Sequence, residues 1–159
     1  AVQALRDLDM HREVQLIVSG GIRNGADVAK AMALGADAVS IGSAALIALG
    51  DNDPKWQAEY KKLGTFAGAY DDWHEGKDPA GITTQDPKLI KRFDPVAGGK
   101  RLSNYLKVMT LEAQTIARAC GKNDLHNLEP EDLCALTVEA AAMAGVPLSG
   151  TSWIPGSKF

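Results

Sequence analysis

Two glycine turns, each placed after a short apolar run, constrain most strongly what this chain can fold into. The first run, VQLIV at 14–18, leads into SGG at 19–21. The second run, ADAVSI at 36–41, leads into another glycine turn, and the segment between the turns has apolar residues at helical spacing from 24 to about 34. Buried strands of parallel sheets have continuous apolar runs, and a helix joins one such strand to the next. The sequence therefore predicts two parallel strands with a right-handed helical crossover, and a second helix after the second turn.

The rest of the chain is predicted to be mostly helical, with one long loop. Residues typical of helix starts and helix ends predict a helix at 53–64. Residues 64–100 contain several glycines and prolines, and their apolar residues follow neither helical nor strand spacing, which indicates a long ordered loop. Apolar stripes predict two further helices, at about 102–120 and 130–144. The first residues, 1–8, are typical of the end of another helix.

Composition and charge exclude several classes of protein. The 159 residues carry a net charge of −3, whereas nucleic-acid binders usually show a basic patch. No apolar run approaches the ~20 residues that span a bilayer. The two cysteines are predicted to be free thiols, as expected in the cytoplasm. We therefore expect a cytoplasmic chain that binds neither nucleic acid nor membrane. A complete eight-stranded α/β barrel needs roughly 200 residues or more, so we also expect this chain to be a piece of something longer.

The paired glycine turns indicate a phosphate site. Both turns follow parallel strands, and ligands of α/β proteins bind at the carboxyl ends of such strands. The helix that follows each turn also directs its positive end there. Arg23 adds positive charge and Ser43 adds a hydroxyl donor. A dinucleotide-binding Rossmann fold is disfavoured, because the turn reads GGxxxG and no acidic residue ends the second strand.

The stretch SGGIRNGADVAKAMALGADAVSIGSAALIALG (19–50) resembles the last two βα units of FMN-binding (β/α)8 barrels of the glutamate synthase family. The resemblance continues through PAGITTQDP (79–87) and NYLKVMTLEAQTIARACG (104–121). It implies that residues 1–50 form the C-terminal portion of a TIM barrel. It also implies that residues 51–159 form the C-terminal extension of the glutamate synthase type, with a helix, a long loop and two helices.

The resemblance also implies the residues that contact a cofactor. Gly20, Gly21, Gly42 and Ser43 would bind the phosphate of FMN, and Ser19 and Arg23 would lie close to the cofactor. No catalytic acid or base is assigned within this chain, because the residues that contact the substrate are expected from strands that it lacks.

The family's iron–sulfur ligands are missing from the sequence. Glutamate synthases carry three cysteines before the P-x-G-x-x-T-Q-D segment, which hold a [3Fe-4S] cluster. The corresponding positions here are Ala67, Trp73 and Asp78, none of which offers a thiolate. We therefore expect no [3Fe-4S] cluster and no other metal site in this chain.

Within the family, GAYDDWHEGKDPAGITTQDP (68–87) and HNLEPEDLCALTVEAAAMAGVPLSGTSWIPG (126–156) are most similar to the large subunits of N-methylglutamate synthases, or methylamine–glutamate N-methyltransferases. That resemblance implies a redox-neutral exchange. Glutamate is oxidised to the imine, methylamine displaces ammonia, and the hydride returns to give N-methylglutamate. Such a cycle needs no external electrons, which fits the missing cluster.

Other functions stay open from the sequence alone. One is a glutamate synthase-like FMN oxidoreductase that reduces 2-iminoglutarate to glutamate with electrons from another route. Another is a non-catalytic structural subunit that binds a phosphate ligand, and a third is a sugar-phosphate enzyme of the same barrel type. The resemblance implies several partners: the N-terminal part of the barrel, glutamine-amidotransferase-like and other glutamate synthase-type subunits, and a small amine together with glutamate.

Overall fold

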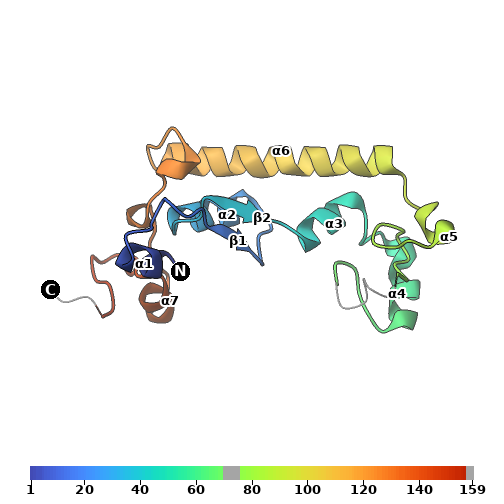
Figure 1. Cartoon of the computed structure of the whole chain (residues 1–159), viewed down its shortest axis with the longest axis horizontal. Helices are drawn as coiled ribbons and strands as arrows, with labels where there is room; N and C mark the ends of the chain where they lie inside the picture. Colours follow the sequence, from blue (N-terminus) through green and yellow to red (C-terminus); the bar gives the residue numbers. More distant parts are fainter. Residues whose placement is uncertain (70–75, 157–159) are drawn as a thin grey trace. The chain divides into compact units, whose positions relative to one another are not determined.

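The computed structural model describes residues 1–69 and 76–156 (Figure 1). The chain divides into two compact units. The first unit combines residues 1–40 with the C-terminal residues from 109 onward, and the second comprises residues 41–108. One long helix contributes residues to both units.

The first unit is built around a small parallel sheet. Strands β1 (Ile17–Ser19) and β2 (Ala38–Ser40) pair in parallel, with Ser19 opposite Ser40. Around them lie α1 (Val2–Asp7), α2 (Gly25–Ala33), the end of α6 (Pro95–Ala119), two 3₁₀ turns, η3 (Leu125–Asn127) and η4 (Pro130–Asp132), and α7 (Val138–Ala144). The predicted order of strand, helix and parallel strand is therefore confirmed.

The strands are shorter than the apolar runs that predicted them. At their starts, hydrogen bonds to the side chain and backbone of Asp37 take the place of the regular hydrogen bonds between paired strands. Its carboxylate Oδ2 accepts a hydrogen bond from the backbone N–H of Leu16 at 2.6 Å. Its own N–H donates to the Leu16 carbonyl at 2.8 Å. The carboxylate thus takes a donor at the point where a regular strand pair would begin, and extended pairing starts only at Ile17.

Helix α2 packs its small residues against the end of α6 (Figure 1). The buried cluster consists of Ala29, Met32, Ala33, Ala36, Ala117 and Leu128, with Val18 of β1 packed against it. Alanine at these positions lets the helix backbones approach closely. The predicted helix at 24–34 is confirmed, since the Asn24 side chain caps its start and Gly35 follows its end in a left-handed conformation.

The second unit contains α3 (Ser43–Leu49), the 3₁₀ turn η1 (Pro54–Trp56), α4 (Gln57–Leu63), α5 (Pro87–Ile90) and the start of α6. The prediction of a loop throughout 64–100 is wrong in part. Asp86 caps α5, and Oδ1 of Asp94 accepts hydrogen bonds from the N–H groups of Val96 and Ala97. Each aspartate precedes a proline. An Asp-Pro pair favours a helix start even where the apolar residues that follow show no helical spacing.

The helix predicted at 130–144 is also wrong in part. Only η4 and α7 are helical, and Ala135 between them forms an isolated parallel bridge with Leu148. The Thr137 side chain then caps α7 by accepting from the N–H of Ala140 at 3.2 Å. A tertiary pairing with the chain's last segment therefore overrides the helical period of the apolar residues.

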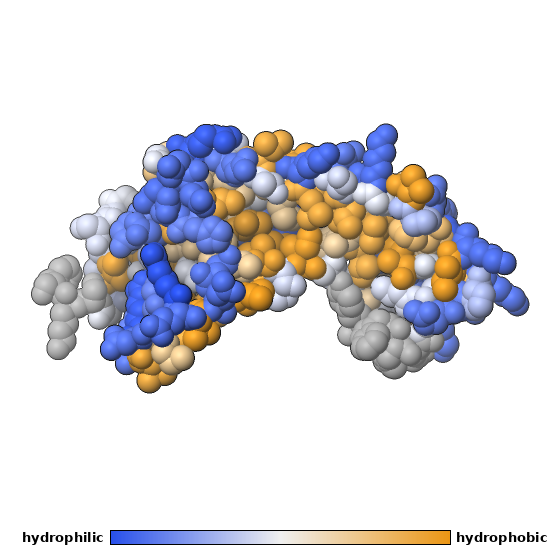
Figure 2. Space-filling view, turned by 45° about the horizontal axis from the view of Figure 1, so that its top comes forward, coloured by the Kyte–Doolittle hydropathy of each residue, from blue (hydrophilic) through white to orange (hydrophobic). Residues whose placement is uncertain are grey.

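Apolar residues also form part of the visible surface of each unit (Figure 2). In the first unit, the exposed fractions are 65% for Ile17 of β1, 85% for Leu136 and 89% for Met143. Within residues 1–69 and 76–156, no helix is long and apolar enough to cross a membrane. The α/β class is confirmed. The assignment to a TIM barrel, and the division of the chain at residue 50, stay predictions.

Candidate functional site

The first glycine turn leaves β1 with a backbone that favours glycine. Gly20 has φ of +98° and Gly21 has φ of +71°, both in the region that other residues rarely adopt. A Cβ atom built at either position would meet no atom within 4 Å. The glycines are therefore set by backbone conformation and not by crowding, and the space beside the turn is open. Ser19 immediately precedes them, at the end of β1.

Arg23 lies one turn before the body of α2 and interacts with Asp27. Its backbone N–H donates to Oδ2 of Asp27 at 3.1 Å, and its Nε lies 3.6 Å from the same oxygen. Asp27 also pairs with Lys30 at 2.9 Å, and this hydrogen bond is the largest contribution that lowers the pKa of the Asp27 carboxyl. The Arg23 side chain is 79% exposed, so an anion bound at the turn could share it with Asp27.

The start of α2 is held from a distant part of the chain. The N–H of Gly25 donates to Oε2 of Glu112, on α6, at 2.6 Å. Sequence reasoning missed Glu112, because one glutamate in the middle of a long helix is usually a solvated side chain. No local signal could have identified it, since its partner is 87 residues away.

The second glycine turn belongs to the second unit. Gly42 precedes α3 with φ of −124°, and the Ser43 hydroxyl donates to the Gly68 carbonyl at 2.9 Å. Ser19, Gly20, Gly21 and Arg23 belong to the first unit. The strand register places Ser19 opposite Ser40, two residues before Gly42. The predicted phosphate contacts are thus distributed over both units, and Ser43 already uses its hydroxyl hydrogen.

A second polar cluster lies in the second unit, around Tyr60 of α4. The Tyr60 hydroxyl donates to Oδ1 of Asp51 and lies 2.9 Å from Oδ1 of Asp78. Asp51 is 4% exposed, and its other oxygen accepts from the Gly68 N–H at 2.5 Å. Burial raises the pKa of Tyr60, and the two carboxylates raise it further, so the phenol remains a protonated donor.

Asp78 is saturated with hydrogen bonds. It accepts from the N–H groups of Ala80 at 2.9 Å, Ile82 at 2.7 Å and Thr83 at 2.8 Å, and its Oδ1 also faces the Tyr60 hydroxyl. Burial raises the pKa of the Asp78 carboxyl, but the hydrogen bonds outweigh burial and hold this pKa below 3.8. An ionised carboxylate offers about four acceptor sites, and three backbone donors together with the neighbouring Tyr60 hydroxyl surround this one.

These contacts bear on the iron–sulfur cluster that the family implies. Asp78 is fully engaged with its own loop, and Ala67 has no ligating atom, so these two positions do not fit a cluster. Trp73 lies outside the described residues. Within residues 1–69 and 76–156, no group of three or more His, Cys, Asp or Glu side chains could hold a metal ion. A cavity of about 260 Å³ opens beside Tyr60 and Asp78, with Leu46, Leu63 and Phe66 among its lining residues.

Comparison with known proteins identifies the family. A family profile described as a conserved region in glutamate synthase matches residues 1–55 and 69–123. The chain belongs to the glutamate synthase family. It is 83% identical over 156 residues to a glutamate synthase large subunit-like protein of Rhizobium meliloti, covering 98% of this chain and 35% of that protein.

More distant relatives carry more specific names. An archaeal-type glutamate synthase [NADPH] of Dehalococcoides mccartyi is 37% identical over 92% of this chain and 27% of its own length. An archaeal glutamate synthase [NADPH] of Methanocaldococcus jannaschii is 40% identical over 79% of this chain and 22% of its own length. The chain therefore spans about a third or less of these family members. No solved structure matches it significantly.

Proposed function

We propose that this chain forms part of the FMN site of an N-methylglutamate synthase, which converts methylamine and L-glutamate to N-methyl-L-glutamate and ammonia. The observation that carries the proposal is the turn after β1. Gly20 and Gly21 adopt left-handed backbone conformations with open space where side chains would stand. Such a turn lets a phosphate approach the backbone closely.

The donor set fits a phosphate dianion. The backbone N–H groups of Gly20 and Gly21 would hold it, with the Arg23 guanidinium adding charge and Ser19 lying next to the turn. The resemblance to the family also implies contacts from Gly42 and Ser43, and to make its contact the Ser43 hydroxyl would have to give up its bond to the Gly68 carbonyl. When bound, FMN supplies reversible hydride transfer at the amine-bearing carbon of glutamate.

Other parts of the proposal concern what surrounds this chain. Two parallel strands do not bury both of their faces by themselves, and Ile17 of β1 is 65% exposed. We propose that further strands of a (β/α)8 barrel cover this sheet. Glutamine-amidotransferase-like and other glutamate synthase-type subunits are the proposed protein partners, and the substrate-binding residues are proposed to lie mainly outside this chain.

The choice of methylamine depends on the missing cluster ligands. The resemblance implies that Ala67 and Asp78 stand where glutamate synthases place cysteines, and the Asp78 carboxylate accepts three backbone N–H groups of its own loop. An exchange of ammonia for methylamine needs no electrons from outside, so it needs no cluster. The segments 68–87 and 126–156 also resemble N-methylglutamate synthases.

A second candidate function is glutamate synthesis by reduction of 2-iminoglutarate. The names of the relatives from D. mccartyi and M. jannaschii favour it. In this case electrons would reach the flavin without the three family cysteines, from a donor subunit.

One set of measurements separates the candidates. The protein expressed from its complete gene is purified, its visible absorption spectrum is recorded, and iron is assayed in the same sample. We expect flavin bands without stoichiometric iron, and formation of N-methylglutamate from methylamine and glutamate. Flavin bands with glutamate formed from 2-oxoglutarate and a donor subunit, and no N-methylglutamate, would favour the second candidate, and iron in the sample would point to cluster ligands outside this chain. A colourless protein that does not take up FMN would contradict both candidates and leave a structural subunit that binds another phosphate.

A further inference from the structure

The glycine turn after β1 is held at both of its ends. At one end, β1 finishes at Ser19, which is paired with Ser40 of β2. At the other end, the first residue of α2, Gly25, donates its N–H to Oε2 of Glu112 at 2.6 Å. The five residues 20–24 therefore span two fixed points. The position of the second point is set by α6, which is distant in sequence.

Close packing of the helix backbones forces this contact. A Cβ at Gly25 would lie 2.4 Å from the Met109 carbonyl oxygen, 2.5 Å from the Ala113 nitrogen and 2.6 Å from the Glu112 Cβ. Only glycine allows α2 to begin directly against α6. The approach leaves the Gly25 N–H buried and facing Glu112, and an unsatisfied N–H at a buried helix start is costly.

Hydrogen bonds between near neighbours in the sequence connect Gly25 to the residues that follow the Gly20–Gly21 turn. The Asn24 side chain accepts from the Asp27 N–H at 2.9 Å, and the Asp27 carboxylate accepts from the Arg23 N–H at 3.1 Å. Residues 23–27 thus form one hydrogen-bonded unit, which the bond between Gly25 and Glu112 connects to α6. A displacement of Gly25 would be transmitted to Arg23 and to the glycines before it.

We propose that Glu112 is a positioning residue for the phosphate of FMN: its carboxylate fixes the start of α2 and thereby the conformation of the Gly20–Gly21 turn. This inference rests on the proposed function. Glu112 does not bind the phosphate itself, since two anions would repel each other. Its acceptor oxygen is the required feature, and its charge is not. Glutamine, which keeps an acceptor oxygen of similar reach, should therefore replace it.

The test uses the protein expressed from its complete gene, freed of bound flavin and titrated with FMN and with riboflavin, which lacks the phosphate. In Glu112→Ala we expect about tenfold weaker binding of FMN and unchanged binding of riboflavin, as a lost helix cap next to the turn would give. Glu112→Gln should bind both flavins as the wild type does. Gln114→Ala, at an exposed position of the same helix, is the matched control and should also behave as the wild type.

Several results would overturn the inference. One is a Glu112→Ala that binds FMN as tightly as the wild type; another is a folded Glu112→Ala that loses affinity for FMN and riboflavin equally, because the lost bond would then not act on the phosphate. If Glu112→Ala does not fold, Glu112→Asp, which is one methylene shorter, replaces it and should bind FMN more weakly than Glu112→Gln. A wild type that binds FMN no better than riboflavin would instead contradict the proposed phosphate site itself. A wild type that prefers FMN, with no effect of the Glu112 variants, would contradict only the role of Glu112.

Discussion

The two turn regions of this chain use glycine and carboxylate in opposite ways. After β1, Gly20 and Gly21 leave open space beside the backbone, and the Glu112 carboxylate accepts a hydrogen bond from the first residue of the helix that follows. In the second unit, Asp78 accepts three hydrogen bonds from the backbone of its own loop, and a Cβ at Gly81 would lie 2.1 Å from the Leu89 carbonyl oxygen.

The backbone beside the glycines after β1 is open, whereas the loop around Gly81 is filled by its own backbone and carboxylate. An open turn with left-handed glycines keeps backbone donors accessible at little cost in packing. The Asp78 carboxylate, by contrast, is engaged by backbone donors of its own loop, and the glycine next to it is crowded by the backbone of Leu89. Substitutions in the two regions should therefore act on different properties, namely ligand binding in the first and stability in the second.

The largest effect is expected from Gly81→Ala. Gly81 has φ of +77° and its Cβ would collide with the backbone of Leu89, so we expect a loss of about 3 kcal/mol or more in the free energy of unfolding. Gly64→Ala is the matched control: its φ is +75° and its Cβ would meet nothing within 4 Å. It should cost only about 1 kcal/mol. Urea unfolding of both variants checks this, and equal losses would show that crowding is not the cause.

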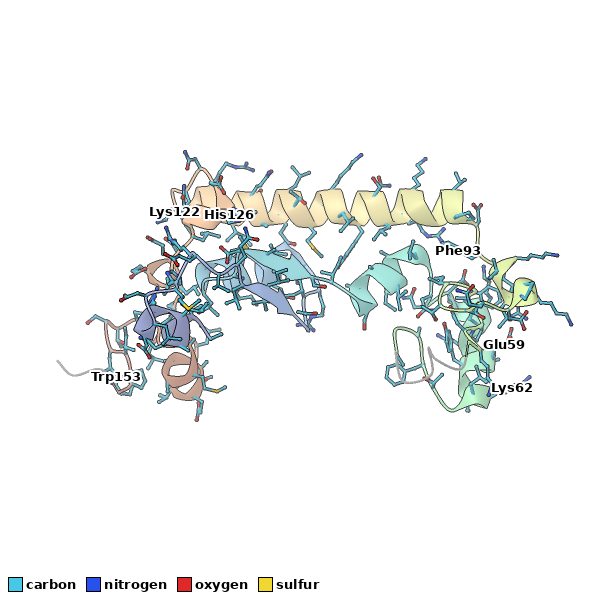
Figure 3. All side chains as sticks on the ribbon, in the orientation of Figure 1. Glu59, Lys62, Phe93, Lys122, His126 and Trp153 are labelled. Carbon is cyan, nitrogen blue, oxygen red and sulfur yellow. The ribbon has the colours of Figure 1, made fainter. Side chains whose placement is uncertain are left out.

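Tyr60→Phe should follow. It removes the hydroxyl between Asp51 and Asp78 and leaves a deeply buried carboxylate short of a donor, at a cost of about 2 kcal/mol. Glu59→Gln serves as a control in the same helix. Glu59 lies on α4 (Figure 3), and its ion pair with Arg92 at 2.8 Å joins two substantially exposed side chains, so the loss should cost at most about 0.5 kcal/mol. Thermal unfolding of the two variants measures the difference, and a harmless Tyr60→Phe would contradict the cluster's role.

Gly20→Ala should have a smaller effect on stability and a larger one on ligand binding. The left-handed backbone makes alanine unfavourable by about 1 kcal/mol, but its methyl group meets no protein atom. The same methyl group would occupy the space proposed for the phosphate. We therefore expect weaker binding of FMN with unchanged binding of riboflavin, measured by flavin titration. A loss of stability as large as that of Gly81→Ala would contradict the comparison between the two regions.

The second unit should lose stability in acid through Asp78. Because the hydrogen bonds hold its folded pKa below 3.8, the stabilisation is complete above that value and is lost as the pH falls through the lower, folded pKa. Unfolding free energies of the wild type and Asp78→Asn should therefore differ by a constant amount at neutral pH. The difference should shrink below about pH 4. A difference that is independent of pH down to acid unfolding would show that the charge of Asp78 does not matter.

The first unit should show the opposite pH dependence through His126, with the smallest effect. Its Nε2 lies 3.0 Å from the Asp37 carbonyl oxygen and its Nδ1 lies 3.2 Å from Asp124 Oδ1, on the segment that follows α6 (Figure 3). Only the protonated ring donates to both, so the bond to Asp37 and then the Asp124 carboxylate raise the pKa of His126 above 6.5. This stabilisation is present below 6.5 and is lost as the pH rises through the folded pKa.

The matching measurement compares the wild type with His126→Gln. The wild type should be slightly more stable at about pH 6, and the two should converge above about pH 8. The effect is small because the His126 side chain is 62% exposed. A difference that grows with pH would have the wrong sign and would contradict the two-bond geometry.

The sequence by itself determined the features that depend on a few neighbouring residues. The cap at Asn24, the glycine that ends α2 at Gly35, and the parallel order of β1, α2 and β2 all follow from local chemistry and apolar spacing. The segments 19–50, 79–87 and 104–121 also resembled the glutamate synthase family, which the family profile confirmed. These features are readable because each is decided within about four residues along the chain.

Only the tertiary structure decided which distant groups meet. The bond from Gly25 to Glu112, the Tyr60 hydroxyl between Asp51 and Asp78, and the bridge from Ala135 to Leu148 that interrupts a helical pattern join residues that no local rule relates. Each depends on how closely two backbones approach, and that distance is set by packing. Local capping and spacing therefore predicted the open glycine turn, whereas packing decided what holds it in place.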